Sequence, residues 1–258
     1  MLEVRGASYQ YGEQPALRAI DLTVDAGQLV AVTGPNGSGK STLLKLIARV
    51  IAPSAGEVRF EERALASWAP REYARRVGYL PQEPESAFPM RALDVVASGR
   101  APFLHRFAWE DDADFAIARE ALTTCDAAHL EGRYLDEMSG GERKRVFLAR
   151  VLAGKPKLIL LDEPLAALDI AHVQQFSRLM REVVDATGAT ILFASHDLNW
   201  ASAFSDRVLV MRDGALAADL PSADLMRAEV IRELFGFDAA VVESGGRRWL
   251  VPGVGGDE

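Results

Sequence analysis

Four short apolar runs divide the chain and set its expected architecture. They are Leu29–Thr33, Leu158–Leu161, Thr190–Ala194 and Val208–Met211, and each shows little polar alternation. Such runs are typical of strands that are buried on both faces of a sheet. Helix-like segments follow the first three runs, so the pattern predicts a parallel α/β sheet.

Other stretches of the chain follow different patterns. Residues 2–28 and 56–65 alternate apolar and polar positions and carry glycine turn signals, which suits antiparallel strands. Residues 85–137 are interrupted by prolines and then become helix-like over 109–125. The acidic residues at the start of that helix are interpreted as compensation of the helix dipole on a solvated face. The sequence therefore predicts a mostly helical insertion in an α/β core.

Composition narrows the classes of protein to consider. The chain has 258 residues, of which 49% are hydrophobic, so it can bury a sizeable core as one large domain or two lobes. A net charge of -8 argues against extensive electrostatic binding of nucleic acid and against a polybasic membrane anchor. Cys125 is the only cysteine, so we expect a reducing compartment. We find no secretory signal and no apolar run of the ~18 residues that span a bilayer. A membrane role is therefore expected to need another chain.

The strongest motif is GPNGSGKST at residues 34–42, which matches G-x-x-x-x-G-K-[ST] between a strand run and a helical run. Its glycines let backbone N–H groups point at phosphate oxygens, and the following helix N-terminus favours an anion. Lys40 supplies a cation for the β- and γ-phosphates, and Ser41 can ligate Mg²⁺. The residues expected to bind a nucleotide are Gly34, Pro35, Asn36, Gly37, Ser38, Gly39, Lys40, Ser41 and Thr42.

Two carboxylates end the second apolar run, in KLILLDEP at residues 157–164. The carboxyl end of a parallel strand faces the crevice in which ligands bind. Asp162 is expected to hold Mg²⁺ directly or through water, and Glu163 to activate water as a general base. Helix capping is the alternative role of the pair. The two motifs together predict a Mg-dependent nucleotide phosphatase or kinase. A GTPase is disfavoured because neither Asn36 nor Asn199 precedes a lysine.

A second candidate anion site is MSGGE at residues 138–142. Ser139 and Glu142 form a Ser-x-x-Glu capping box, which leaves Gly140 and Gly141 unexplained because glycine weakens a first helical turn. The N–H groups of these glycines and Ser139 Oγ can hold a phosphate. A second phosphate cradle suits a pair of chains in which each cradle closes on the γ-phosphate bound by its partner.

The order of these motifs resembles that of ATP-binding-cassette (ABC) transporter ATPases, over about residues 2–235. The small departures are Met138, Glu142 and Leu165, and none of them removes a catalytic group. The resemblance implies catalytic roles for Lys40, Glu163 and His196. It implies that adenine stacks on Tyr11, with Tyr9 as the competing candidate. It also implies that Gln82 contacts Mg²⁺ and the permease, and that Asp169 lies in the dimer interface.

The resemblance also implies the fold, namely a P-loop NTPase (RecA-like) core with an antiparallel β subdomain and an inserted helical subdomain. One nucleotide-binding domain would cover residues 1–258. Its core and β subdomain would span about 1–84 and 155–236, and its helical subdomain about 85–154. Residues 237–258 are expected to form a loose tail because they are rich in glycine.

SGRAPF at 98–103 and LDIAHVQQF at 168–176 resemble the ATPases of iron–siderophore, haem and vitamin B12 importers. This resemblance implies a head-to-tail homodimer that uses ATP and Mg²⁺ to energise permease subunits at the cytoplasmic face of the inner membrane. It also implies an indirect link to a substrate-binding protein, and no nucleic-acid partner. The segment from Gln82 to about residue 107 would receive a permease helix, with apolar contacts or local core packing supplied by Phe88, Met90, Phe103 and Phe107.

Two other functions stay open at this point. One is a soluble ABC ATPase that acts as an assembly switch of the iron–sulfur assembly type. The other is a monomeric P-loop kinase, which would leave MSGGE without a role.

Overall fold

The computed structural model describes residues 1–84, 89–105, 109–166 and 170–252. Contacts divide the chain into two compact units. The first unit comprises Met1–Leu65 and Leu192–Glu258, and the second comprises Ala66–Ile191. None of the helices in the described ranges is long and apolar enough to cross a membrane.

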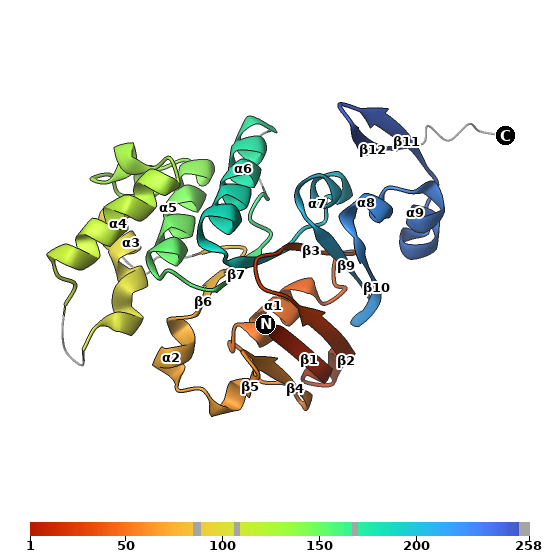
Figure 1. The fold of residues 1–258 in the computed structure, drawn as a ribbon, viewed down its shortest axis with the longest axis horizontal. Coiled ribbons are helices and arrows are strands. Elements are labelled where there is room, and N and C mark those ends of the chain that lie inside the picture. The colour runs from red at the N-terminus through yellow and green to blue at the C-terminus, as the bar shows by residue number, and fades with distance from the viewer. Residues whose placement is uncertain (85–88, 106–108, 167–169, 253–258) are drawn as a thin grey trace. The chain divides into compact units, whose positions relative to one another are not determined.

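An antiparallel sheet of the first unit contains β1 (Leu2–Tyr11), β2 (Gln14–Val24), β4 (Ala55–Phe60) and β5 (Arg63–Ala64). Its strand order is β2-β1-β4-β5 (Figure 1). Leu2 lies opposite Val24 on one side and opposite Phe60 on the other, and all three are buried. The predicted antiparallel strands are thus confirmed, with the alternate apolar positions packed into the core.

The same unit contains the strand that leads to the phosphate-loop motif. All five residues of β3 (Leu29–Thr33) are buried, and β3 runs parallel to β9 (Arg207–Arg212), which pairs antiparallel with β10 (Ala215–Pro221). The helices of this unit are α1 (Lys40–Ile47), α7 (Leu198–Phe204), α8 (Ser222–Leu225) and α9 (Ala228–Phe235).

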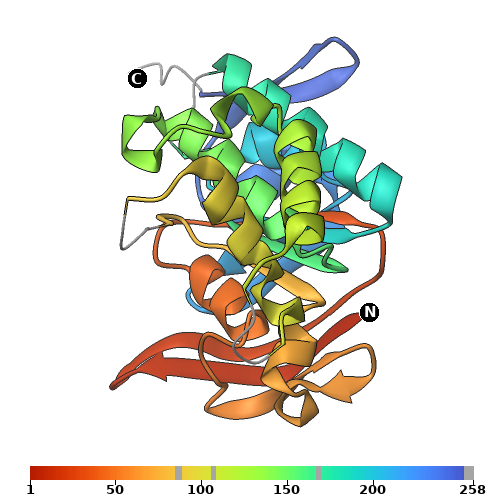
Figure 2. The same ribbon diagram turned by 90° about the vertical axis from the view of Figure 1, so that its left-hand side faces the viewer.

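The second unit combines a parallel strand pair with a helical cluster. β6 (Val77–Leu80) and β7 (Leu158–Asp162) pair in parallel, with Val77 opposite Leu158. The helices are α2 (Pro70–Ala74), α3 (Ala92–Ala97), α4 (Asp112–Thr124), α5 (Gly140–Ala153) and α6 (Ile170–Thr187). Helix α5 packs against α3, α4 and β6. Figure 2 shows these three helices in yellow and green. Short 3₁₀ helices cover Leu65–Ser67, Ser98–Phe103, Ala128–Leu130 and Leu135–Glu137.

Strand β8 (Thr190–Ala194) contains the boundary between the units, and all of its residues are buried. In the second unit, the Thr190 N–H donates to the Lys157 carbonyl at 2.8 Å. In the first unit, the N–H of Ser195 donates to the Val32 carbonyl at 3.0 Å. All four predicted apolar runs are therefore strands, and the predicted α/β class is confirmed. Within the second unit α5 packs on β6, and β6 pairs with β7, while the helical subdomain expected over 85–154 stays a prediction.

The C-terminal segment differs from the loose tail expected over 237–258. β11 (Ala239–Ser244) and β12 (Arg247–Pro252) form an antiparallel hairpin, which corrects that expectation for these residues. Gly245 and Gly246 make the two-residue turn with φ of +60° and +71°, the left-handed conformation that such hairpin turns require. This turn gives the Ser-Gly-Gly at 244–246 a structural role.

The acidic start of α4 is only partly what the sequence predicted. Asp111 caps the helix and accepts hydrogen bonds from the N–H groups of Ala113 and Asp114 at 3.0 Å, as dipole compensation requires. Asp114, however, is buried and ion-paired with Arg100 Nε at 2.9 Å, so it does not lie on a solvated face. Arg100 also donates to the Ala153 carbonyl, which connects the start of α4 to the end of α5.

We expect Arg100→Ala to lower the free energy of unfolding by about 3–5 kcal/mol, because the carboxylate of Asp114 would stay buried without its cation. Urea unfolding followed by circular dichroism measures this loss. Arg119→Ala is the matched control, since it removes an exposed ion pair with Glu131 and should cost less than about 1 kcal/mol. Equal losses in the two variants would contradict the assignment of Arg100–Asp114 as a structural pair.

Candidate functional site

The expected site residues fall into two sets, one in each compact unit. The first set lies around residues 34–42, which connect β3 to α1. Gly34 has a φ of +144°, and a Cβ there would stand 2.1 Å from the Met211 carbonyl oxygen. Gly39 has a φ of +103°, and its Cβ would stand 2.7 Å from the Ala16 carbonyl oxygen. Only glycine fits these two positions, so the loop backbone is held tightly between β2 and the end of β9.

The inside of this loop contains donor groups suited to phosphate. Lys40 is 5% exposed, and its Nζ donates to the Gly34 and Pro35 carbonyls at 2.8 and 3.0 Å. Ser38 Oγ is buried and has no hydrogen-bond partner among the described residues. A buried hydroxyl without a partner is costly unless a ligand satisfies it. The residues present therefore fit the phosphates of a nucleotide.

The remaining loop residues leave access to this cradle. Pro35, Asn36 and Gly37 are exposed at the tip of the loop, and a Cβ added at Gly37 would meet no other atom within 4 Å. Ser41 is half-buried and Thr42 is buried in the first turn of α1. The sequence-predicted loop thus has exposed residues at its tip and buried donors inside.

Two more predicted residues belong to this unit. Tyr11 ends β1 with 48% of its surface exposed, and its ring meets that of Tyr9 edge to face at 4.9 Å between centroids. Tyr9 is only half-buried, so the more exposed ring favours Tyr11 for stacking on a base. His196 is exposed two residues after the end of β8, and the intervening Ser195 is hydrogen-bonded to Val32 on β3.

The second set begins at the end of β7. Asp162 is buried, and the Tyr79 hydroxyl on the neighbouring β6 lies 3.4 Å from its Oδ2. Glu163 is half-buried and adopts a φ of +47°, which is uncommon for a residue other than glycine. Sequence reasoning missed Tyr79, although it stands in VGYLPQ close to the selected Gln82. Gln82 itself is exposed, three residues beyond Tyr79 along the chain.

Ser139 begins α5 with the predicted capping box. Its Oγ accepts from the Glu142 N–H at 3.3 Å and donates to Glu142 Oε2 at 2.8 Å. The Ser139 N–H also donates to that carboxylate at 2.8 Å and, together with the hydroxyl, lowers the pKa of Glu142. Gly140 is exposed with open space around it, Gly141 is half-buried, and Met138 is buried as expected of an apolar residue there.

Lys144 connects this helix to the carboxylates at the end of β7. Its Nζ donates to the Ala166 carbonyl, in the segment that follows Asp162 and Glu163. Burial lowers the pKa of Lys144, while the charge of Glu163 acts in the opposite direction. The sequence alone did not single out Lys144, because a lysine in a basic helix resembles any solvated cation.

Some expected contacts lie outside the described residues. Asp169, Phe88 and Phe107 are among them. Of the other apolar candidates, Met90 and Phe103 are half-buried. The ring of Phe103 lies 3.9 Å from the guanidinium carbon of Arg100, so it takes part in local packing.

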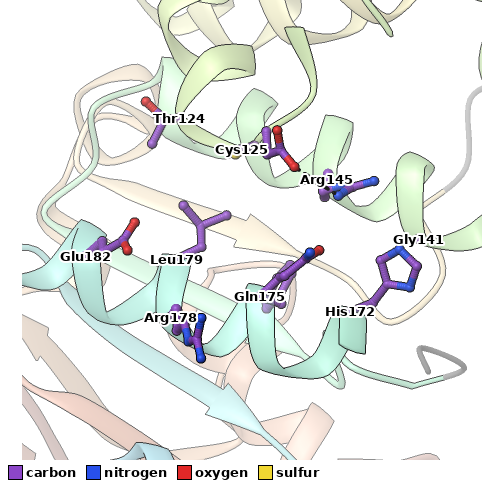
Figure 3. Close-up of a pocket in the computed structure, with 11 residues that line it drawn as sticks. Thr124, Cys125, Gly141, Arg145, His172, Gln175, Arg178, Leu179 and Glu182 are labelled. Atoms are coloured by element: carbon purple, nitrogen blue, oxygen red, sulfur yellow. Dashed lines mark ion pairs between the residues drawn. The ribbon is translucent and has the colours of Figure 1, made fainter. Parts of the chain in front are cut away.

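A cavity of about 240 Å³ lies between helix α5, helix α6 and the end of helix α4 (Figure 3). Arg145, His172 and Arg178 line it together with Glu182. Cys125 also borders it, but burial raises the pKa of this thiol to about 12. Cys125 therefore stays a neutral thiol at physiological pH and is a poor nucleophile or metal ligand.

Comparisons with known proteins agree with this arrangement. Residues 17–166 match the family model described as ABC transporter. The hemin import ATP-binding protein HmuV of Nocardia farcinica is 40% identical over 235 residues, which cover 90% of this chain and 81% of that protein.

Two solved structures extend the comparison to the fold. One is a metal-chelate type ABC transporter in an inward-facing conformation, which matches with a TM-score of 0.84 and 27% identity over 97% of this chain and 96% of that one. The other is a dimeric bacterial ABC transporter cassette, with a TM-score of 0.76 and 27% identity over 86% of this chain and 99% of that one. From its sequence, its fold and the shape of its phosphate loop, this chain belongs to the ABC transporter family, as the component that binds and hydrolyses ATP.

Proposed function

We propose that this chain energises a multi-chain importer whose cargo is haem, another iron chelate or cobalamin. The use of ATP in this proposal is supported mainly by the glycine loop, in which Lys40 and the unpartnered Ser38 hydroxyl face inward. The cargo class is supported by the similarity to a hemin import protein and to a metal-chelate type transporter. No cargo-binding residue is assigned to this chain.

ATP would bind with its phosphates in the loop and its adenine on Tyr11. On binding, the γ-phosphate would replace the carbonyl partners of Lys40, and Ser38 Oγ would gain an acceptor. Mg²⁺ would be held by oxygen atoms of Ser41, Asp162 and Gln82, the type of ligand that this ion prefers, and would neutralise phosphate charge.

Hydrolysis requires a base that activates water. We assign this role to Glu163, half-buried at the end of β7, and contact with the γ-phosphate to His196. General-base catalysis of this kind typically contributes about 10²–10⁴-fold. The charge of Glu163 acts to raise the pKa of Lys144, so this cation lies within electrostatic reach of the carboxylate.

The second cradle at Ser139–Gly141 is assigned to the ATP of a partner copy in a head-to-tail homodimer. Ser139 and Gly140 are exposed, as a surface that closes on another chain must be. Asp169 would lie in that interface. The exposed Gln82 would contact the permease at the cytoplasmic face of the inner membrane, with a substrate-binding protein linked indirectly.

We expect Glu163→Gln to bind ATP, to turn over at least about 10²-fold more slowly and to accumulate as a dimer. The carboxamide keeps the shape of the side chain but cannot accept the proton of water. Size-exclusion chromatography with light scattering and an ATPase assay measure both effects. Lys40→Ala is the matched control, since it should weaken ATP binding and stay monomeric. A monomeric and active Glu163→Gln protein would overturn the assignment.

Ser139→Ala should lower kcat by about tenfold or more and leave ATP binding to the monomer nearly unchanged. The variant removes an oxygen that, in the proposed dimer, would contact the partner's nucleotide, and it leaves the Lys40 loop of its own chain unchanged. Fluorescent ATP titration at low protein concentration measures binding, and steady-state kinetics measures turnover. Loss of ATP binding by the monomer would show that Ser139 acts within its own chain.

The importer assignment is tested by capture of partners in the native host. Tagged Glu163→Gln protein is purified from membranes in mild detergent, and its partners are identified by mass spectrometry. A polytopic membrane protein in near-equal amount supports the importer, and uptake assays with haem, iron chelates and cobalamin then identify the cargo. A soluble partner instead of a membrane protein would favour the assembly switch.

A further inference from the structure

The C-terminal hairpin contacts helix α7, which begins two residues after His196. The contact is a pair of hydrogen bonds to one residue of β12. Asn199 Nδ2 donates to the Leu250 carbonyl at 3.1 Å, and the Leu250 N–H donates to Asn199 Oδ1 at 2.6 Å. We call this pair the Asn199 clamp. It connects the first turn of α7 to a strand 51 residues later in the chain.

The clamp requires a carboxamide. One side chain must accept from a peptide N–H and donate to a carbonyl of the same residue, which aspartate cannot do when ionised. Leu250 lies opposite Val241 in the hairpin. In an antiparallel pair, a residue that directs both backbone groups outward makes no ladder bond with its partner. The clamp therefore uses backbone groups that the hairpin itself leaves available.

A second contact holds the other end of the helix. The guanidinium carbon of Arg247 lies 5.1 Å from the ring centroid of Phe204, the last residue of α7. The hairpin thus touches α7 in its first turn and at its last residue. An isolated helix of seven residues is not stable in water, so these contacts and those of its buried face determine its position.

The buried face of α7 connects it to the strand before His196. Trp200 is 3% exposed, and its ring lies 4.4 Å from that of Phe193 on β8. Asp197 caps the helix by accepting from the Trp200 N–H at 3.0 Å. His196 therefore stands in a short connection between a fixed strand and a helix that is held on its outer side by the hairpin.

We propose that the C-terminal hairpin positions His196 by holding α7, with Asn199 as the positioning residue. The proposal rests on the role assigned to His196 above. Without the clamp, the first turn of α7 loses two hydrogen bonds on its outer side. The imidazole then samples more orientations, so turnover falls, whereas ATP binding by residues 34–42 is unaffected.

The test compares Asn199→Ala and the isosteric Asn199→Asp with the unchanged chain. We expect kcat to fall about three- to tenfold in both variants, with KM for ATP within about twofold. Ser202→Ala is the matched control, because it removes a hydrogen bond from the same helix to Ser222 rather than to the hairpin. Its kcat should stay within about twofold of the unchanged chain.

The partner side of the clamp provides a second variant. Leu250→Pro removes the N–H that Asn199 accepts, and proline is tolerated where a strand makes no ladder bond. We expect the same fall in kcat, and the double variant with Asn199→Ala should be no slower than either single variant. Additive losses would contradict the clamp.

Hydrogen exchange of the amides in residues 198–204 gives a readout that does not depend on activity. Faster exchange in Asn199→Ala, together with the fall in kcat, supports the proposal. Unchanged exchange would show that the hairpin does not hold α7, and faster exchange with unchanged kcat would show that α7 does not position His196. Wild-type turnover in His196→Ala would instead overturn the proposed role of His196, and exchange would still decide whether the clamp exists.

Discussion

The carbonyl oxygen of Met211 occupies the space that any side chain at position 34 would need. This close approach fixes the phosphate loop, and a second one between Gly39 and the Ala16 carbonyl fixes its other end. Backbone hydrogen bonds complete the arrangement, since Gly214 donates to the Ser38 carbonyl and accepts from the Arg18 N–H. Segments distant in sequence thus converge on one loop. The antiparallel strand β2 therefore helps to shape the loop that we propose binds the phosphates, in addition to covering the core.

The parts of the molecule that the sequence predicted are those with a local signal. Each apolar run became a strand because burial on both faces needs little more than a continuous apolar segment. The glycine loop and the Ser139 capping box were visible for the same reason, since their residues lie within a few positions of one another. The hairpin turn at Gly245–Gly246 also had a local signal, but the glycine-rich composition around it suggested a loose tail.

The parts that could not be predicted depend on contacts between distant residues. Tyr79 and Asp162 meet because β6 and β7 pair in parallel, and no spacing in the sequence encodes that register. Asn199 and Leu250 meet only through the fold of the hairpin onto α7. Asp114 was expected on a solvated face but is buried, because it pairs with Arg100, which lies before the helix and not on it.

The backbone of Glu163 is conformationally strained at the end of β7. Its φ of +47° lies in the left-handed region, which disfavours a side chain with a Cβ by roughly 1–2 kcal/mol. Glycine, and to a lesser degree asparagine, adopts this conformation more readily. Replacing Glu163 by either residue would relieve strain while removing the carboxylate, so stability and activity oppose each other at this position. Laboratory evolution of this chain under selection for heat resistance alone would therefore tend to discard the carboxylate to which we assign the role of general base.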